Sequence, residues 1–327
     1  MKTLEQAFPN LIIRKKPEDI KELNDMPGST IMIYHHTGMG DHISLSSLVR
    51  RIAKDGNYEK VYLICFESNN ANVCKLYQDS EVIEICTIPN RGDHNTIIKQ
   101  WVAKKNPSKF LQLGFDDWGR LDGYKGLYVD TLMYAAAGYP VKTRWDDYYF
   151  QRDEEAEETA FKKVNPDNRR YIFIHDPGDE PQHQWRGRIT DSLVRRLSTS
   201  GGPASGGQQW QWIDGDEDTL IIRNNPSIPL MHMGKILENA CELHMMESSL
   251  RCFAEGLDTS RVQHYHHHYI RDHYNIDHGT RKVWMVVEEY DPEVKLRLLN
   301  GPAQLDHFDK YGTICKNLHG FYCPTWF

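Results

Sequence analysis

Short runs of β-branched and aromatic residues alternate along the first half of the chain with stretches of helical spacing. The first run, residues 30–34, leads through two glycines into a stretch from 43 to 52 whose apolar residues follow a helical pattern. Similar runs follow at 60–65, 81–86 and 110–113, and helical patterns occupy 97–105 and 128–137. Strands that alternate with helices are typical of a parallel sheet, so this half predicts one α/β domain over residues 1–150.

The second half has the same plan without an obvious sequence repeat. A charged helical stretch at 152–164 precedes a strand-like run at 171–175, and further runs of this kind lie at 220–223, 242–245 and 261–269. The segments between them, 191–197, 231–240 and 250–256, have helical spacing. The pattern therefore predicts a second α/β domain over residues 151–327.

Two segments fall outside this alternation. Residues 201–207, Gly-Gly-Pro-Ala-Ser-Gly-Gly, contain no apolar side chain larger than alanine, and we interpret them as a flexible or engineered linker. Residues 305–327 contain aromatic residues and cysteines without a clear period. We assign no function to either segment.

Composition narrows the class of protein. Of 327 residues, 39% are hydrophobic and 11% aromatic, which is typical of a globular chain and excludes disorder for its bulk. The net charge of −7 disfavours nucleic acid or an anionic membrane as a partner. No apolar run approaches the ~20 residues of a membrane span, and residues 1–16 lack a signal-peptide pattern, so we expect a cytoplasmic protein. The 7 cysteines are scattered and predict neither disulfides nor a zinc knuckle.

The glycine turn after the first strand carries the first candidate site. Residues 36–44 read His-Thr-Gly-Met-Gly-Asp-His-Ile-Ser, so Gly38 and Gly40 let a ligand approach the backbone beside Asp41 and His42. The third glycine of a dinucleotide-binding fingerprint is missing, and a carboxylate at a helix start would repel a pyrophosphate. A dinucleotide site is therefore disfavoured, and Asp41 can serve simply as a helix cap.

Two further polar segments follow strands of the second half. The first has His175 at a strand end and, after a turn, Arg186 and Arg188, whose guanidinium groups can bind a phosphate or simply lie on the surface. The second is a turn between a buried strand and a helix, where hydroxyls and helix amides can bind an anion. This turn consists of Glu247, Ser248 and Ser249. The two serines can equally serve as helix caps.

Alternation along residues 263–269 places His264, His266 and His268 on one side of a strand. Three imidazoles can bind a transition metal, but ligands that alternate along one strand lie about 6 to 7 Å apart, and no fourth ligand is evident in the sequence. We therefore predict no metal and no other cofactor. The histidines are interpreted as contacts to a sugar or nucleotide at a cleft edge, or as packed core residues.

The order of these motifs resembles glycosyltransferases of family 9, the lipopolysaccharide heptosyltransferase type with the GT-B fold. The resemblance covers most of residues 30–275 and rests on the Gly-Met-Gly-Asp turn at 38–41, the basic segment 183–188 and the turn at 247–249. It implies an α/β fold of two Rossmann-like domains that face each other across a cleft. An acceptor would bind to the first domain and a nucleotide sugar to the second, in a transferase of polysaccharide biosynthesis.

Each motif takes a role from this resemblance. Asp41 matches the general base that activates the acceptor hydroxyl, with Gly38, Gly40 and His42 beside it at the acceptor side. The arginines and the polar turn would hold the departing diphosphate, so the transfer would invert the anomeric carbon and need no metal. The implied donor-binding residues are His175, Arg186, Arg188, Glu247, Ser248 and Ser249.

Two other functions stay open. A polysaccharide pyruvyl transferase has a similar two-domain fold with a glycine-aspartate motif near its start, and it would use phosphoenolpyruvate in place of a nucleotide sugar. A non-catalytic carbohydrate-binding protein could have kept the GT-B fold. The departure from the family pattern at residues 247–249 favours this last class.

Overall fold

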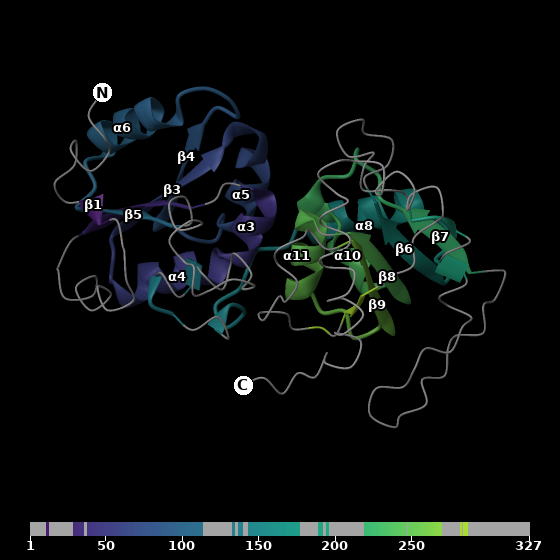
Figure 1. Cartoon of the computed structure of the whole chain (residues 1–327). Helices are drawn as coiled ribbons and strands as arrows, with labels where there is room; N and C mark the ends of the chain where they lie inside the picture. Colours follow the sequence, from purple (N-terminus) through teal and green to yellow (C-terminus); the bar gives the residue numbers. More distant parts are fainter. Residues whose placement is uncertain are drawn as a thin grey trace, which may run out of the picture. The chain divides into compact units, whose positions relative to one another are not determined.

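The computed structural model describes residues 11–12, 29–35, 38–113, 133–134, 137–139, 143–176, 189–191, 194–195, 219–246, 248–269, 282 and 284–286. The chain divides into two compact units, one formed by Met1–Arg152 with Ile276–Gly279 and the other by Asp153–Asn275 with Thr280–Phe327 (Figure 1). Each unit contains one 5-stranded sheet. Among the described residues, no helix combines the length and the apolar character needed to cross a membrane.

The sheet of the first unit is parallel and has the strand order β1-β5-β2-β3-β4. Its strands are β1 (Leu11–Ile12), β2 (Thr30–Tyr34), β3 (Lys60–Phe66), β4 (Ile83–Ile88) and β5 (Lys109–Gln112). The helices are α3 (Met39–Ser44), α4 (Ser46–Asp55), α5 (Asn70–Leu76) and α6 (His94–Lys105), with a 3-10 turn η2 at Glu67–Asn69. The predicted alternation of parallel strands and helices is confirmed in this unit.

Figure 1 shows α6 and α4 on opposite sides of this sheet. Ile98 and Val102 of α6 pack in one apolar cluster with Met32 of β2 and Ile64 of β3. The central strand β2 is buried from its second residue onward, so both of its faces need apolar cover. This requirement explains why its sequence is a continuous apolar run rather than an alternating one.

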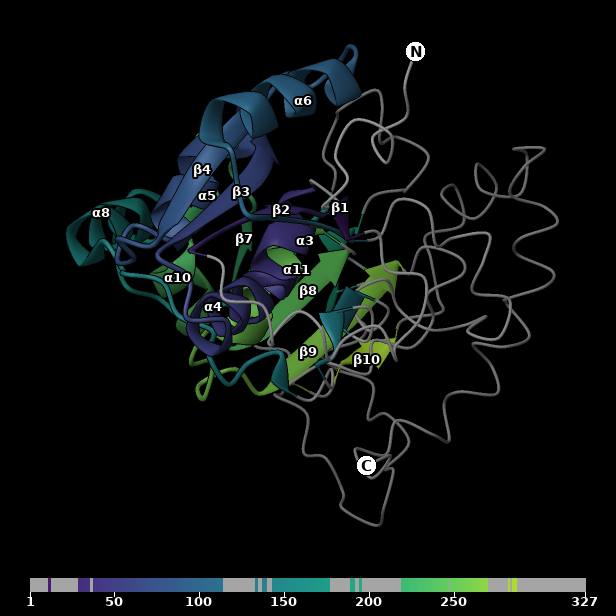
Figure 2. The same ribbon diagram turned by 90° about the vertical axis from the view of Figure 1, so that its left-hand side faces the viewer.

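The sheet of the second unit is also parallel and has the strand order β10-β9-β8-β6-β7. Its strands are β6 (Tyr171–His175), β7 (Leu220–Arg223), β8 (Glu242–Met246), β9 (His264–Tyr269) and β10 (Met285–Val286). Its helical elements are α8 (Glu154–Val164), the 3-10 turn η7 (Leu230–His232), α10 (Gly234–Glu238) and α11 (Ser249–Gly256). Figure 2 shows β8, β9 and β10 side by side.

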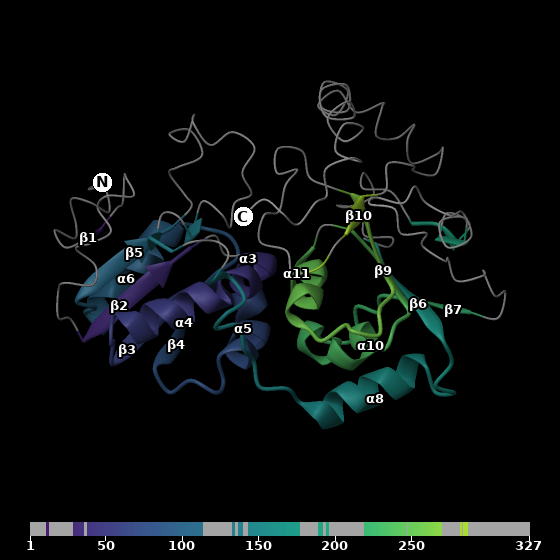
Figure 3. The same ribbon diagram turned by 90° about the horizontal axis from the view of Figure 1, so that it is seen from below.

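Two hydrogen bonds fix α10 against its neighbours, and Figure 3 shows α8 and α10 on one side of the sheet. Tyr171 Oη in β6 donates to the carbonyl of Ile236 in α10 at 2.5 Å. The amide of Lys235 donates to Glu157 Oε2 of α8 at 2.9 Å. Because Glu157 is buried, its carboxylate satisfies an amide of the first turn of α10 that water cannot reach.

The structure corrects several predicted bounds. The predicted helix at 231–240 is instead the turn η7 followed by the short helix α10, which ends at Glu238. The edge strands β1 and β10 were not predicted, because strands of 2 residues carry no alternation. The helices predicted at 128–137 and 191–197 lie largely outside the described residues, and segments 201–207 and 305–327 lie wholly outside them.

Candidate functional site

The glycine turn of the first unit lies at the carboxyl end of β2, the edge of a parallel sheet where ligands usually bind. Gly38 is the N-cap residue of α3, with an extended backbone at φ −63° and ψ 147°. Asp41 therefore lies in the first turn of the helix, at its third position. The interpretation of Asp41 as the helix cap is wrong, because the cap position belongs to Gly38.

Gly38 and Asp41 approach each other closely. A Cβ atom placed on Gly38 would lie only 2.6 Å from Asp41 Oδ2, so a side chain at this position would displace the carboxylate. The Asp41 side chain thus folds back over the turn, and the residue is half-buried. A negative charge in a first helical turn is stabilised by the helix dipole. The arrangement presents a carboxylate of the kind that a general base requires.

His42 is turned into the interior. Both His42 and His35 are 0% exposed, and their ring centroids lie 4.5 Å apart in an edge-to-face arrangement. Burial and then the nearness of His35 lower the pKa of His42 well below its usual value, so its ring is neutral. Neither ring nitrogen of His42 has a hydrogen-bond partner among the described residues. Its assignment to the acceptor side stays a prediction.

The segment after residue 143 holds α3 and α4 in place. Ser47 Oγ in α4 donates to the carbonyl of Thr143 at 3.0 Å and accepts from the amide of Asp147 at 3.1 Å. Arg51 of α4 forms ion pairs with Asp146 and Asp147. The helix α4, which follows the helix with Asp41, is therefore held by residues that lie 96 to 100 positions further along the chain.

The second unit places further candidates at the carboxyl edge of its own sheet. His175 ends β6 and pairs in register with Met245 of the neighbouring strand β8, and Ser248 and Ser249 follow β8. The structure therefore brings these three predicted donor residues to one edge. Arg186, Arg188 and Glu247 lie outside the described residues, and their roles stay predictions.

Ser248 is the N-cap residue of α11, and its Oγ accepts a hydrogen bond from the amide of Arg251 at 3.3 Å. The alternative that this serine caps a helix is thus correct for Ser248. Ser249 is the first residue of the helix and is partly exposed. A helix N-terminus with hydroxyls in its first positions favours a bound anion such as a phosphate.

An arginine that the sequence analysis missed lies at the same edge. Arg223, the last residue of β7, donates from Nη1 to Asp176 Oδ2 at 2.7 Å and from Nη2 to Asp191 Oδ1 at 2.5 Å. Nη2 also donates to the carbonyl of Ile189 at 2.8 Å. A charged residue that ends an apolar strand is the only sequence signal that could have indicated this group. Through these bonds Arg223 holds Asp176, Ile189 and Asp191, which follow β6 in the chain, at the end of β7.

The histidines of β9 are core residues that meet a carboxylate from the next strand. His264, His266 and His268 are at most 6% exposed. Among the described residues, Glu242, His244 and His266 bring one ligand atom each within 4.8 Å of the others. The sequence alone indicates no further ligand, because Glu242 and His244 reach the cluster only through the pairing of β8 with β9.

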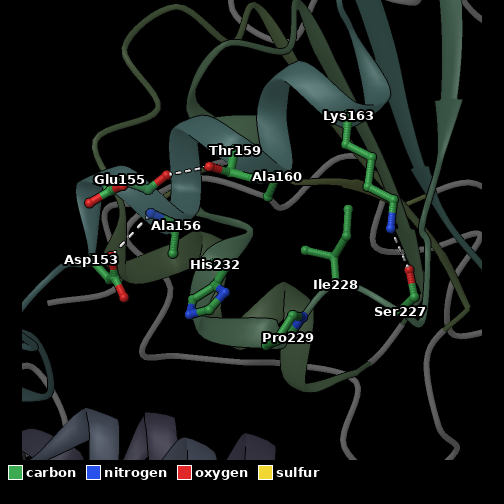
Figure 4. A pocket seen from close by; sticks show the side chains of 10 residues that line it. All are labelled: Asp153, Glu155, Ala156, Thr159, Ala160, Lys163, Ser227, Ile228, Pro229 and His232. Carbon is green, nitrogen blue, oxygen red and sulfur yellow. Dashed lines mark hydrogen bonds between the residues drawn. The ribbon is translucent and has the colours of Figure 1, made fainter.

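A cavity of about 460 Å³ lies between α8 and η7 in the second unit (Figure 4). Its polar groups serve local structure: Asp153 caps α8 by accepting from the amide of Ala156 at 3.0 Å, and Lys163 Nζ donates to Ser227 Oγ at 3.1 Å. None of the predicted site residues that the structure describes lines it. The lining residues are Asp153, Glu155, Ala156, Thr159, Ala160, Lys163, Ser227, Ile228, Pro229 and His232.

Comparison with solved structures identifies the fold. The chain is similar to the glycosyl transferase family 9 from Veillonella parvula DSM 2008, with a TM-score of 0.50 and 10% identity over 88% of this chain and 97% of that one. It also matches the dodecameric iron-containing heptosyltransferase TibC in complex with ADP-D-beta-D-heptose, with a TM-score of 0.43 and 11% identity over 90% of this chain and 79% of that one. No protein-family model matches the chain, and no curated protein matches it by sequence. The expected resemblance to family 9 is confirmed at the level of the fold.

Proposed function

We propose that the chain is a glycosyltransferase that moves a sugar from a nucleotide-sugar donor to a hydroxyl group of a glycan or another acceptor. The observation that carries the proposal is the family 9 fold with a carboxylate, Asp41, held over the glycine turn at the carboxyl edge of β2. In the GT-B arrangement that this proposal includes, the first unit binds the acceptor and the second binds the donor.

Asp41 acts as the general base in this proposal. Its carboxylate accepts the proton of the acceptor hydroxyl while the oxygen attacks the anomeric carbon from the side opposite the nucleotide, so the configuration inverts. Gly38 supports this role because its missing side chain leaves space at the turn. The partial exposure of Asp41 lets an acceptor reach the carboxylate.

The donor diphosphate is bound in the second unit. The first amides of α11, the hydroxyl of Ser249 and the arginines Arg186 and Arg188 supply hydrogen bonds and positive charge to the phosphate oxygens. His175 and Glu247 complete the donor side. These fixed groups stabilise the charge that develops as the diphosphate leaves, so the transfer step itself needs no metal ion.

The test is a donor screen with the full chain. Nucleotide sugars and phosphoenolpyruvate are offered separately with a mixture of glycan acceptors, and nucleoside diphosphate, inorganic phosphate and glycosylated product are measured. Release of a nucleoside diphosphate together with a glycosylated product supports the proposal. Consumption of phosphoenolpyruvate would instead identify a pyruvyl transferase, and glycan binding without affinity for any nucleotide would identify a carbohydrate-binding protein.

A further inference from the structure

Five ionisable side chains form a buried layer on one face of the second sheet. β8 and β9 are parallel neighbours, with Glu242 opposite His264 and His244 opposite His266. Residues in register share a face, as do alternate residues of one strand, so these four side chains and His268 lie together. All five are between 0% and 6% exposed. We call this set the histidine layer: Glu242, His244, His264, His266 and His268.

The spacing at the centre of the histidine layer suits a metal ion. Glu242 Oε2 lies 3.1 Å from His244 Nε2 and 3.4 Å from His266 Nε2. Two ligand atoms that each lie about 2.1 Å from a tetrahedral Zn²⁺ are separated by about 3.4 Å. The two separations that involve the carboxylate oxygen are therefore close to an edge of a coordination tetrahedron, and all three ligand atoms lie within 4.8 Å of one another.

His244 Nε2 and His266 Nε2 both approach the same oxygen of Glu242, and the first of them is hydrogen-bonded to it. The rings of His244 and His266 are stacked, with centroids 4.1 Å apart and an interplanar angle of 15°, so one ring has to turn before both direct a nitrogen at the same ion. His266 Nε2 is buried and has no well-directed hydrogen bond among the described residues. A buried ring nitrogen without such a bond is costly, and a metal ion would satisfy it.

A hydrogen bond with His268 orients the imidazole ring of His244. His244 Nδ1 and His268 Nε2 are 2.9 Å apart and hydrogen-bonded. Without an ion, His244 Nε2 donates to Glu242 Oε2 at 3.1 Å. When Nδ1 donates to His268 instead, Nε2 loses its proton and can bind an ion that it shares with Glu242. Histidine ligands in metal sites are held in the same way, by a hydrogen bond at the ring nitrogen that does not bind the metal.

We propose that Glu242, His244 and His266 bind a divalent transition-metal ion of the Zn²⁺ class, with a water as the fourth ligand. Two imidazoles and one carboxylate favour Zn²⁺ over Mg²⁺ or Ca²⁺, which prefer oxygen ligands. The ion links β8 to β9 inside the second sheet and has a structural role. It stabilises the strand that leads into Ser248 and α11, and the proposed transfer reaction does not pass through it.

The test measures metal binding by the full chain with Zn²⁺ alone. The protein is stripped with EDTA, dialysed, titrated with Zn²⁺ and desalted, and bound metal is measured by mass spectrometry alongside the melting temperature. We expect about one tightly held ion per chain and a melting temperature that rises with Zn²⁺. Wild-type protein that retains no stoichiometric metal and shows no thermal shift would overturn the proposal.

Variants then place the ion. Glu242→Gln and His266→Asn should lose the bound metal, whereas His267→Asn should keep it, because His267 is on the same strand and comparably buried but belongs to the opposite face. Equal metal content in all three variants contradicts the assignment. If the ligand variants fail to fold, the visible absorption spectrum of the wild-type chain with Co²⁺ is measured instead. Four-coordinate Co²⁺ with nitrogen and oxygen ligands absorbs strongly in the visible range, whereas six-coordinate Co²⁺ in solution does not.

Discussion

Arg144 donates a hydrogen bond from Nη2 to Ser44 Oγ at 2.6 Å, and the two residues are 1% and 2% exposed. Ser44 is the last residue of α3, the helix that carries Asp41. Its backbone carbonyl also accepts from Tyr134 Oη at 3.2 Å. The end of the helix that carries Asp41 is thus held by a buried cation and a tyrosine that lie far along the chain.

Replacing Ser44 by alanine should destabilise the first unit. The change removes the acceptor of a buried guanidinium donor, for which we expect a loss of about 1.5 to 3 kcal/mol in the free energy of unfolding. Ser46→Ala is the matched control, because Ser46 Oγ is also buried but donates to the carbonyl of Ile43 in a neutral bond, worth about 1 kcal/mol. Denaturant unfolding of both variants measures the difference, and equal losses would show that the charge of Arg144 contributes nothing.

The local pattern was sufficient to predict most of the fold. Apolar runs such as that of β2 and the helical spacing of α4 are local signals, so the α/β class and parallel sheets followed from the sequence. Short elements were missed because two residues, as in β1, carry no period. The break between η7 and α10 was also missed, since both parts share one helical pattern of apolar residues.

The candidate site was less predictable, because it depends on which strands become neighbours. Asp41 could be proposed from its glycine turn, which is a local feature. The histidine layer could not, since Glu242 and His244 are more than twenty residues before His266 and meet it only through the register of β8 and β9. Arg144 and Ser44 are 100 residues apart in the sequence, so no local pattern could have predicted their hydrogen bond.

A nucleoside diphosphate should stabilise the protein if the donor site is correctly assigned. Ligands that bind only the folded state raise its stability, by about 2.7 kcal/mol at 100 times Kd. Melting temperatures measured with a panel of nucleoside diphosphates at millimolar concentration give the result, with the matching nucleosides as controls that lack the phosphates. If no diphosphate shifts the melting temperature, the donor assignment is wrong.

Two substitutions at Ser248 distinguish the effect of a negative charge at the N-terminus of α11 from the effect of helix capping. Aspartate and asparagine both cap helices about as well as serine, so neither Ser248→Asp nor Ser248→Asn should lower stability much. The added carboxylate of Ser248→Asp would repel the donor diphosphate, and we expect at least about a tenfold loss of nucleotide affinity from this charge. Ser248→Asn should bind nearly as wild type. Calorimetric titration compares the two, and equal affinities would place the diphosphate elsewhere.

The transfer reaction should be independent of exchangeable divalent cations. Protein groups are proposed to stabilise the leaving diphosphate, whereas a catalytic metal would contribute several kcal/mol to this stabilisation. Initial rates measured after brief EDTA treatment, and with added Mg²⁺ or Mn²⁺, should agree within about twofold. Protein preloaded with Zn²⁺ is the control for the buried histidine layer and should give the same rate. A rate that depends on Mg²⁺ or Mn²⁺ would assign a metal to the donor site.

Asp41→Asn should separate catalysis from helix stability. Asparagine keeps the size and much of the hydrogen bonding of aspartate but cannot accept the proton of the acceptor hydroxyl. Loss of the negative charge in the first turn of α3 should cost less than about 1 kcal/mol of stability. Loss of a general base should lower turnover by about 10²- to 10⁴-fold, which corresponds to roughly 3 to 5 kcal/mol in the barrier. Nucleotide affinity should stay near wild type, because the proposed donor groups belong to the second unit.

Asp93→Asn is the matched control for this change. Asp93 caps α6 in the same unit by accepting from the amide of Thr96 at 3.2 Å, and asparagine replaces aspartate at a cap with little loss. Turnover of this variant should equal that of wild type. Asp41→Glu keeps the carboxylate but displaces it by one methylene, so we expect an intermediate rate. An Asp41→Asn protein that folds normally and keeps more than about a tenth of the wild-type turnover would show that another residue is the base.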